Sequence, residues 1–489
     1  MVNNQVPWSS GKTLGGSSVI NAMMSTRGNR KNYDDWAKQG CIGWSYSDVK
    51  PYFLKAEDNQ EPDYIADGYH VVGGPLTVAK QKYHSETFNP IYEAATEMGY
   101  KFEDPDGRHE AGFYDTLTTM RRGQRCSAAK AYLVPAENRT NLDIITNAFV
   151  RKIEIEDGRA QGVEFDHGGE TYTVKAKREV ILSAGTVNSA QLLMLSGIGP
   201  KEHLEEFDIP VKLDLPVGEN FQEQCGPSLF FELDPEIPNR NEKLENKANV
   251  EEYINNRMGV LAGVGASLLA TLSSKYTTLY HPDYHIIFVE RTAPREEFSI
   301  EMTADVIRKY FGPYRNSTLW SCYVQHLRPK SRGTVKLQSA NPFDAPLIDP
   351  NYLAEPEDIL PIVEGFKTCK AIGTSEPLKK IGSKLLEGPF PGCEDSYGDD
   401  DKYYECIARS FISTLNNQVG TVKMGHPSDP TTVVTPRLKV KGIDGLRVVD
   451  ASIMPTIPSI NANLPVIMIA EKASDMIKET IDCPTQLAV

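Results

Sequence analysis

A run of small residues near the start of the chain could surround an anionic group. Gly15, Gly16, Ser17 and Ser18 stand in a row, four positions beyond Gly11. Glycine lets a ligand approach the backbone closely, and successive backbone N–H groups can then surround a diphosphate. A turn that binds no ligand explains these residues equally well when they are taken alone.

Two further candidate ligand contacts stand where predicted strands end. Residues 179–183 are predicted to form a buried strand that runs into Ala184 and Gly185 and then into a helix. Asp450 ends a second predicted strand. Open α/β sheets bind their ligands at the carboxyl ends of strands, so both places are candidates. An aspartate that ends a strand is otherwise most often a helix N-cap.

Composition excludes several classes of protein. The 489 residues are 40% apolar and 24% charged, which is ordinary globular usage. Lys and Arg number 52 against 66 Asp and Glu, a net charge of −14, so no nucleic-acid partner is expected. The longest apolar stretch, residues 258–272, is too short to cross a bilayer, so no membrane span is expected. The sequence contains no Cys-x-x-Cys pair, and no metal site is expected.

The elements that would position these residues follow from the pattern of apolar side chains. Helices are predicted at 32–39, 85–98, 191–195 and 469–477, and strands at 144–145, 150–155, 162–165, 172–174, 322–326, 334–337 and 445–450. The stretch 230–323 is less regular and is interpreted as a second, substrate-facing region. An α/β fold is expected.

Three separated segments carry a shared signature. Residues 11–28 read Gly-Lys-x-Leu-Gly-Gly-Ser-Ser-x-x-Asn-x-Met-x-x-x-Arg-Gly, residues 183–200 begin Ser-Ala-Gly-Thr, and residues 446–455 read Leu-Arg-Val-Val-Asp-Ala-Ser-Ile-Met-Pro. Together they resemble the glucose-methanol-choline (GMC) family of flavin oxidoreductases, in detail its arthropod glucose-dehydrogenase-like branch. The similarity extends from about Trp8 to the last predicted helix.

The resemblance implies flavin adenine dinucleotide (FAD) as the cofactor. It also implies an FAD-binding α/β domain interleaved with a substrate domain built on a mainly antiparallel sheet. The expected cofactor-binding residues are Thr13, Gly15, Gly16, Ser17, Asn21, Ala22, Met23, Met24, Val150, Ala184, Gly185, Asp450, Ala451, Asn461 and Pro465. Val150 would lie near the adenine.

The family's chemistry is the oxidation of an alcohol, in which a hydride passes to the flavin while a base removes the hydroxyl proton. The base is usually a His in a Tyr-His-Pro-Val-Gly-Thr context, which here reads Asn-Asn-Gln-Val-Gly-Thr at 416–421 and places Asn417 in the first catalytic position. Asn463 matches the second, as a partner of the substrate oxygen. A neutral amide accepts no proton, and losing a base costs ~10²–10⁴-fold in rate. His326 and His426 are expected to be ordinary core or surface histidines.

Two further departures concern the cofactor. Residues 217–224 resemble a family loop that usually ends in Asp-His, but here it ends in Glu223 and Gln224. Relatives begin with a strand, a Gly-x-Gly-x-x-Gly turn, a helix and a second strand that hold the ADP half of the cofactor. Only ten residues precede Gly11, so this N-terminal dinucleotide-binding unit is expected to be missing, and a signal peptide with it. A chain truncated there should expose the neighbouring strands and bind flavin weakly.

Three domains are expected. Residues 1–229 would form the FAD-binding part without its first βαβ unit, residues 230–325 the substrate-binding region, and residues 326–475 the C-terminal part, which returns to the FAD domain. Tyr280 and Trp320 are aromatic residues that could line a pocket there but more often belong to a core.

One cysteine pair bears on where the protein folds. Cys393 and Cys406 resemble a paired-cysteine stretch of the arthropod branch, which implies a disulfide and an oxidising compartment. Two buried free thiols remain the alternative. Secretion of a full-length precursor is expected.

The predicted function is FAD-dependent oxidation of the CH–OH group of a sugar or another alcohol, with quinone or oxygen as the electron acceptor. The alternative is an impaired or non-catalytic descendant with a binding or structural role, because an amide stands at the position of Asn417.

Overall fold

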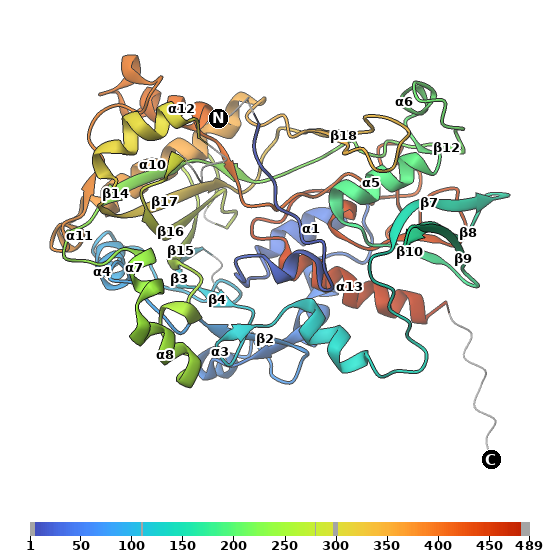
Figure 1. Cartoon of the computed structure of the whole chain (residues 1–489), viewed down its shortest axis with the longest axis horizontal. Coiled ribbons are helices and arrows are strands. Elements are labelled where there is room, and N and C mark those ends of the chain that lie inside the picture. The colour runs from blue at the N-terminus through green and yellow to red at the C-terminus, as the bar shows by residue number, and fades with distance from the viewer. Residues whose placement is uncertain (1–4, 109–110, 279, 297–301, 481–489) are drawn as a thin grey trace.

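The computed structural model describes residues 5–108, 111–278, 280–296 and 302–480. Two interleaved parts lie side by side in Figure 1, one around a six-stranded sheet and one around a pair of parallel strands. Helices and sheets are mixed throughout, and the larger sheet is antiparallel, so the expected α/β fold with an interleaved antiparallel domain is confirmed. No helix in these ranges is long and apolar enough to cross a bilayer.

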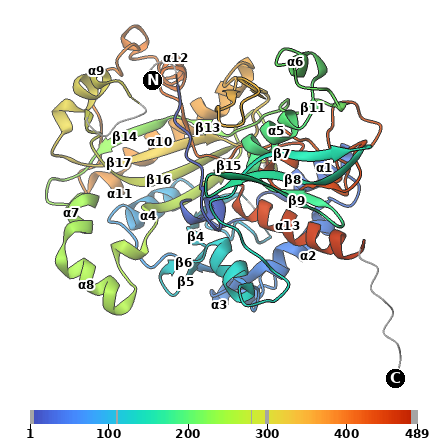
Figure 2. The ribbon, with the colours of Figure 1, turned by 45° about the vertical axis from the view of Figure 1, so that its right-hand side comes forward.

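The six-stranded sheet draws its strands from distant parts of the chain. Its order is β20 (Lys384–Leu385), β14 (Ser228–Glu232), β17 (Thr318–His326), β16 (Tyr284–Thr292), β15 (Ala266–Leu272) and β3 (Gly112–Asp115). Every residue of β17 is buried, because helix α10 (Leu360–Gly373) packs on the sheet. The rings of Phe231 and Trp320 stack with centroids 4.5 Å apart in the core beneath this helix. Figure 2 shows α10 lying along the strands.

The expectation that residues 230–323 are irregular is wrong. This stretch supplies β15, β16 and most of β17. The apolar residues of β15 follow a glycine-rich segment, 259–265, which hides the start of the strand in the sequence. β15 forms its backbone hydrogen bonds with β3 and β16, and both of these strands lie elsewhere in the chain. The local sequence therefore does not indicate the pairing.

The second part carries the predicted strand ends. Strand β10 (Val180–Leu182) pairs in parallel with β22 (Leu446–Val448) and leads into α5 (Gly185–Leu195). Ile181 is 44% exposed, so the expectation of a fully buried strand is wrong there. Among the described residues β22 is the only strand that pairs with β10. The expected strand at residues 144–145 is also wrong, because this segment has no regular structure and no pairing partner.

A three-stranded antiparallel sheet of β7 (Phe149–Glu156), β8 (Arg159–His167) and β9 (Glu170–Lys175) confirms the strand prediction for this region. Further helices are α1 (Arg30–Lys38), α2 (Tyr46–Ala56), α4 (Phe88–Glu97), α12 (Asp400–Ser410) and α13 (Asn463–Lys478). The side chain of Asn29 caps α1 by accepting from the backbone N–H of Lys31, so this helix begins two residues earlier than predicted.

The remaining helices and strands are short. They are α3 (Pro62–Ala66), α6 (Lys201–Glu205), α7 (Arg240–Glu245), α8 (Lys247–Asn256), α9 (Ala304–Val306), α11 (Glu376–Lys379), β1 (Glu57–Asn59), β2 (Leu76–Lys80), β4 (Leu117–Thr118), β5 (Met120–Arg121), β6 (Gln124–Arg125), β11 (Ile198–Gly199), β12 (Leu213–Asp214), β13 (Cys225–Gly226), β18 (Thr334–Lys336), β19 (Leu347–Asp349) and β21 (Ser413–Thr414). Cys406 lies within α12 and forms a disulfide with Cys393, which precedes this helix. This confirms the implied pairing.

Candidate active site

The glycine-serine loop has the backbone that its sequence predicts. Gly15 and Gly16 have φ of +93° and +56°, a left-handed conformation that favours glycine. A Cβ on Gly16 would meet no atom within 4 Å, so the backbone there faces open space. The hydroxyl of Ser18 fixes the loop by donating to the carbonyl of Gly15 at 2.6 Å and accepting from the N–H of Ala128 at 2.9 Å. Thr13 lies in the same turn and accepts from the N–H of Gly16 at 2.9 Å.

Residues 21–24 continue this loop towards the six-stranded sheet. The side-chain oxygen of Asn21 accepts from the N–H of Met23 at 3.0 Å and from the guanidinium of Arg125 at 2.7 Å. Ala22 lies between these two loop residues, and Met24 forms an isolated bridge to Thr118. Arg125 was not found by sequence reasoning, because it belongs to no motif and meets Asn21 only through the fold.

A buried cluster of charges anchors the end of the loop. The guanidinium of Arg27 contacts Glu57 at 2.5 Å, and His70 lies between Glu57 at 2.6 Å and Asp104 at 2.9 Å. Burial disfavours the charged form of His70, but its hydrogen bonds to the two carboxylates outweigh burial and raise its pKa to about 9. The backbone N–H of Arg27 also donates to Asp106, whose pKa burial raises to about 7.

The two strand ends meet through Asp450. One carboxylate oxygen accepts from the N–H of Gly185 at 2.9 Å and the hydroxyl of Ser189 at 2.5 Å, and the other accepts from the N–H of Ser452 at 2.8 Å. Both oxygens are therefore engaged within the protein, and the N-cap interpretation describes this side chain. Gly185 has φ of +84°, and a Cβ there would meet no atom within 4 Å. The N–H groups of Ala184 and Gly185 are thus bonded to Ser189 and Asp450, and the space beside Gly185 is open.

The two candidate catalytic amides lie on neighbouring segments. The side-chain oxygen of Asn417 accepts from the backbone N–H of Ala462 at 3.0 Å, and Asn463 follows as the first residue of α13. The hydroxyl of Thr186 in α5 donates to the carbonyl of Gln418 at 2.6 Å, which ties the Asn417 loop to the strand-end site. The structure thus brings together residues that stand 45 positions or more apart in the sequence.

Three polar atoms around these loops are buried and make no hydrogen bond to the described residues. They are Nδ2 of Asn417, Oδ1 of Asn461 and Nε1 of Trp8. The Trp8 ring stacks on Phe221 with centroids 5.4 Å apart. The Nδ2 of Asn461 donates a hydrogen bond to the sulfur of Met24 at 3.4 Å. An unsatisfied buried polar group costs about 1–3 kcal/mol. Their arrangement fits a polar ligand that pairs with them.

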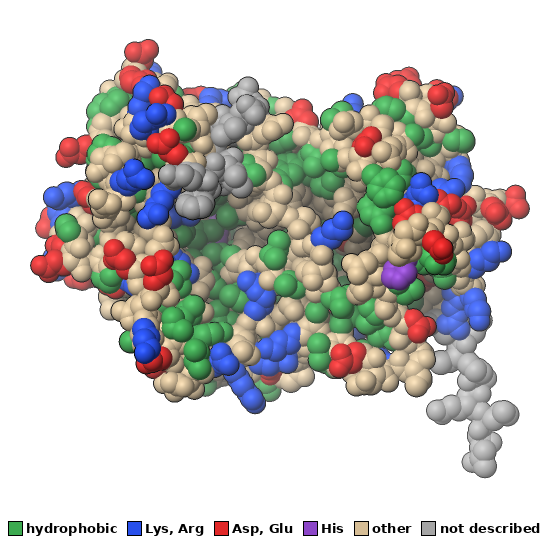
Figure 3. Space-filling model, viewed as in Figure 1, with side chains coloured by type: hydrophobic (Ala, Val, Ile, Leu, Met, Phe, Trp, Pro, Cys, Tyr) green, Lys and Arg blue, Asp and Glu red, His purple; other side chains and the backbone are tan. Residues whose placement is uncertain are grey.

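An apolar cluster closes the site on the side of the six-stranded sheet. Its buried members are Met24, Tyr114, Ala266, Leu269, Ile287 and Tyr323. Figure 3 shows charged side chains of both signs spread around this face and hydrophobic ones in its recess. No basic surface dominates this face, in keeping with the net charge of −14.

The other expected residues lie at the periphery or in the core. Val150 is half-buried on β7, which packs beside α5, and Pro465 is buried in the first turn of α13. His326 is a satisfied core residue bonded to Asp358 at 3.3 Å, and His426 is exposed, so both histidine predictions are confirmed. Tyr280 is 76% exposed.

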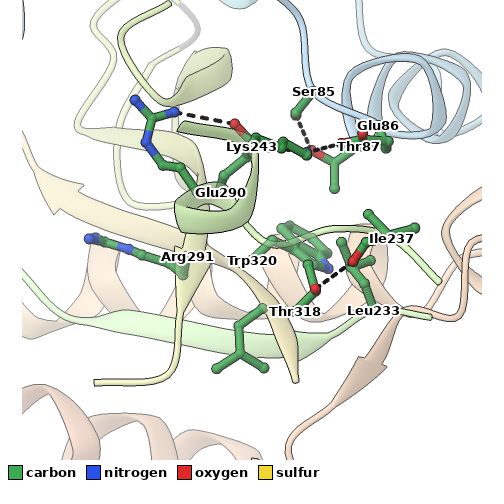
Figure 4. Close-up of a pocket in the computed structure, with 12 residues that line it drawn as sticks. Ser85, Glu86, Thr87, Leu233, Ile237, Lys243, Glu290, Arg291, Thr318 and Trp320 are labelled. Atoms are coloured by element: carbon green, nitrogen blue, oxygen red, sulfur yellow. Dashed lines mark hydrogen bonds and ion pairs between the residues drawn. The ribbon is translucent and has the colours of Figure 1, made fainter. Parts of the chain in front are cut away.

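Trp320 belongs to the core and lines a small cavity of about 10 Å³, which is room for a single water. Figure 4 shows a cluster of charges beside it, in which Lys243 contacts Glu86 and Glu290, the latter at 2.7 Å. These ion pairs tie α7 to β16 and serve packing. No group of three or more potential metal ligands occurs among the described residues.

Comparisons with known proteins agree with this geometry. Family models described as GMC oxidoreductase match residues 1–225 and 329–470. A glucose dehydrogenase [FAD, quinone] from Drosophila pseudoobscura pseudoobscura is 39% identical over 96% of this chain and 74% of its own length. Human mitochondrial choline dehydrogenase is 35% identical over 96% of this chain and 76% of its own length.

Solved structures lead to the same family. A formate oxidase from Aspergillus oryzae RIB40, studied for modification of its FAD, superposes with a TM-score of 0.83 and 26% identity, over 97% of this chain and 85% of that one. An FAD-dependent oxidoreductase from Chaetomium thermophilum gives a TM-score of 0.81 and 27% identity, over 98% and 88%. Since the family models cover most of the chain and the curated relatives match nearly all of it, this chain belongs to the GMC oxidoreductase family.

Proposed function

We propose that this chain is an FAD-dependent oxidoreductase that oxidises the CH–OH group of a sugar or another alcohol. The observations that carry the proposal are the open backbone at Gly16 and Gly185 and the buried side-chain atoms of Asn417, Asn461 and Trp8 that make no hydrogen bond to the described residues. The names of the relatives, glucose and choline dehydrogenases, support the substrate class.

The residues that would hold FAD lie on the loops described above, on β7 and in the first turn of α13. They are Thr13, Gly15, Gly16, Ser17, Asn21, Ala22, Met23, Met24, Val150, Ala184, Gly185, Asp450, Ala451, Asn461 and Pro465. Bound flavin supplies the acceptor for the hydride of the alcohol carbon. Asp450 acts indirectly, because its carboxylate fixes the backbone of Gly185.

Asn417 and Asn463 would orient the substrate oxygen. The carbonyl oxygen of Asn417 is already paired with the N–H of Ala462, so this residue presents its Nδ2 as a hydrogen-bond donor. A donor amide can hold a hydroxyl oxygen in place but takes no proton from it. We therefore expect slow turnover, reduced by ~10²–10⁴-fold relative to a site with a positioned base.

A binding and turnover experiment tests this function. FAD is titrated into the purified chain while flavin fluorescence is followed, and a panel of sugars and alcohols is then added under anaerobic conditions. Binding of FAD and loss of the oxidised flavin absorbance with at least one substrate are expected. The proposal fails if FAD binds and no member of the panel reduces it over hours.

The second candidate is a non-catalytic GMC homologue with a binding role, favoured by the amide at Asn417. The variant Asn417→His separates the two candidates, because it restores a group that can accept a proton. A gain of ~10²-fold or more in kcat supports an impaired site, whereas a native rate that the variant does not improve rules out the non-catalytic candidate.

We also propose folding in an oxidising compartment and secretion, supported by the Cys393–Cys406 disulfide. Electron transfer would be to a quinone or to oxygen. Anaerobic assays with a quinone dye, compared with oxygen uptake in air, distinguish these acceptors.

A further inference from the structure

The segment Gln222–Glu223–Gln224 is packed between the two loops that carry the candidate catalytic amides. All three side chains are at most 3% exposed. The backbone of Gln222 exchanges two hydrogen bonds with Val419, at 3.0 and 2.9 Å. Its side chain donates to the carbonyl of Pro455 at 3.0 Å and accepts from the N–H of Ile457 at 3.2 Å. One residue thus contacts the loop of Asn417 and the chain that leads to α13.

Glu223 makes the most concentrated set of contacts. The hydroxyls of Thr414 and Tyr352 donate to its carboxylate, as does the side-chain amide of Gln418 at 2.9 Å. The backbone N–H of Asn417 also acts on this carboxylate and favours its charged form. Three hydrogen-bond donors around one carboxylate suit its ionised form, and within the described residues no Lys, Arg or His forms an ion pair with it.

Gln224 fixes the opposite loop, and its orientation follows from chemistry. It contacts the carbonyls of Leu327 at 3.1 Å and Pro458 at 2.7 Å, and because carbonyls only accept, the atom that meets them is Nε2. Its Oε1 then accepts from Gln325 at 3.0 Å. The oxygen of Gln325 is therefore left to accept from Nδ1 of His285 at 3.3 Å, which extends the ordered chain into the sheet.

We propose that Glu223 is a positioning residue of the active site, whose carboxylate holds the loop of Asn417 through Thr414 and Gln418 so that the amide of Asn417 and Asn463 face one substrate oxygen. The inference rests on the proposed function. Glu223 touches no substrate in this arrangement and acts through the loop. Its neighbours Gln222 and Gln224 hold the segment before α13, so one buried tripeptide sets the distance between both amides.

The ionisation of Glu223 provides a readout. Burial raises its pKa to about 7, against the opposing hydrogen bonds from Thr414 and Tyr352. The titratable groups that face it are Tyr352 and Cys225, whose pKa values burial raises, so both keep their protons at neutral pH. Asp358 and His326 line the same small cavity as Glu223.

Asp358 stays ionised, because its hydrogen bonds, the one from His326 foremost, outweigh burial and lower its pKa. His326 lines the same cavity and is bonded to Asp358 at 3.3 Å. It supplies the matched control, His326→Gln.

The sign of the stability effect follows from the raised pKa. A carboxyl whose pKa is higher in the folded state stabilises the fold below its unfolded pKa, and that contribution is lost as the pH rises through about 7. Glu223→Gln removes this loss, so the variant should have a higher thermal midpoint than the wild type at about pH 8.5, a smaller gain at about pH 5.5 and no gain below about pH 4. If the carboxylate instead stabilised the fold, Glu223→Gln would have a lower thermal midpoint than the wild type at about pH 8.5.

Hydrogen exchange tests the contact without any need for turnover. At about pH 8.5 the amide of Asn417 in Glu223→Gln is expected to exchange roughly 10-fold or more faster than in the wild type, and at about pH 5.5 the two rates should converge. With an alcohol that the protein oxidises as substrate, kcat of the wild type should decrease as the pH falls below about 7, which forms an acidic limb in the pH profile. Glu223→Gln should lack this limb and have ~10²-fold lower kcat at nearly unchanged KM. His326→Gln should keep the limb.

The outcomes separate this inference from the proposed function. Equal exchange at Asn417 in Glu223→Gln and wild type at both pH values overturns the inference, even where alcohol oxidation is observed. Faster exchange in the variant at high pH supports it, even where no alcohol is oxidised and the proposed function fails. If Glu223→Gln does not fold, the wild type alone provides the test. The protection of the Asn417 amide against exchange, corrected for the intrinsic pH dependence of exchange, must then decrease as the pH falls through about 7. Unchanged protection overturns the inference.

Discussion

Replacing His70 with glutamine is expected to destabilise the protein in a pH-dependent way. The imidazolium of His70 lies between Glu57 and Asp104, with its side chain completely buried. A buried carboxylate pair that loses its shared cation retains uncompensated charge, which is strongly destabilising. The loss should be largest where His70 carries its proton in the wild type.

The magnitude follows from the pKa of His70. Its rise from 6.5 to about 9 corresponds to about 3 kcal/mol of stability, undiminished by solvent because the group is buried. Since the folded pKa is raised, this contribution is fully present below about pH 6.5 and is lost as the pH rises through about 9. For 489 residues the unfolding entropy is about 1 kcal/mol per kelvin, so the expected shift of the midpoint is about 3 °C.

Thermal unfolding followed by tryptophan fluorescence, at one scan rate, measures this shift. His70→Gln should lower the midpoint by about 3 °C near pH 6.5 and by less than about 1 °C above pH 9.5. The exposed His426 offers a control, and His426→Gln should leave the midpoint unchanged at both pH values. A shift for His70→Gln that is the same at both pH values would refute the assignment of a charged His70.

Two further substitutions test the loops and the disulfide. Gly185→Val forces a β-branched residue to φ of +84° and fills open space, so FAD affinity should fall by roughly 10-fold or more. The control is Gly168→Val, at φ of +61° in the exposed β8–β9 turn, which should strain the backbone equally and leave FAD affinity intact. Equal losses of affinity in both would exclude a ligand contact at Gly185. Cys393→Ser opens a loop of 13 positions and should cost up to about 3 kcal/mol in unfolding measurements, while wild type and variant should behave alike once reduced.

Local chemistry explains what the sequence could predict. Gly15, Gly16 and Gly185 were singled out as places where a ligand could approach the backbone, and all three have positive φ, because the freedom of a glycine is a property of the residue itself. The parallel strand that ends at Asp450 was also found from its own apolar run. In each case the prediction depended on a few adjacent residues.

Long-range pairing explains what it could not predict. Asp450 was interpreted as a ligand contact or an N-cap, and the choice was made by Ser189, 261 positions away, whose hydroxyl occupies its carboxylate. Arg125 and the strands β14, β15 and β16 were missed for the same reason, since their partners lie in other segments. Glu223 was noticed only as a departure from a family pattern, and its three donors come from segments 129 positions or more further along the chain.

The cost of Glu223 bears on whether the site still works. At neutral pH a buried carboxyl whose pKa is raised weakens the fold, and a glutamine would relieve that cost. The same residue, with Gln222 and Gln224, holds both loops that carry Asn417 and Asn463. Active sites commonly keep such destabilising groups because they hold reactive geometry. We therefore expect a site that positions an alcohol well and removes its proton poorly, so that Asn417→His should act mainly on kcat and leave KM nearly unchanged.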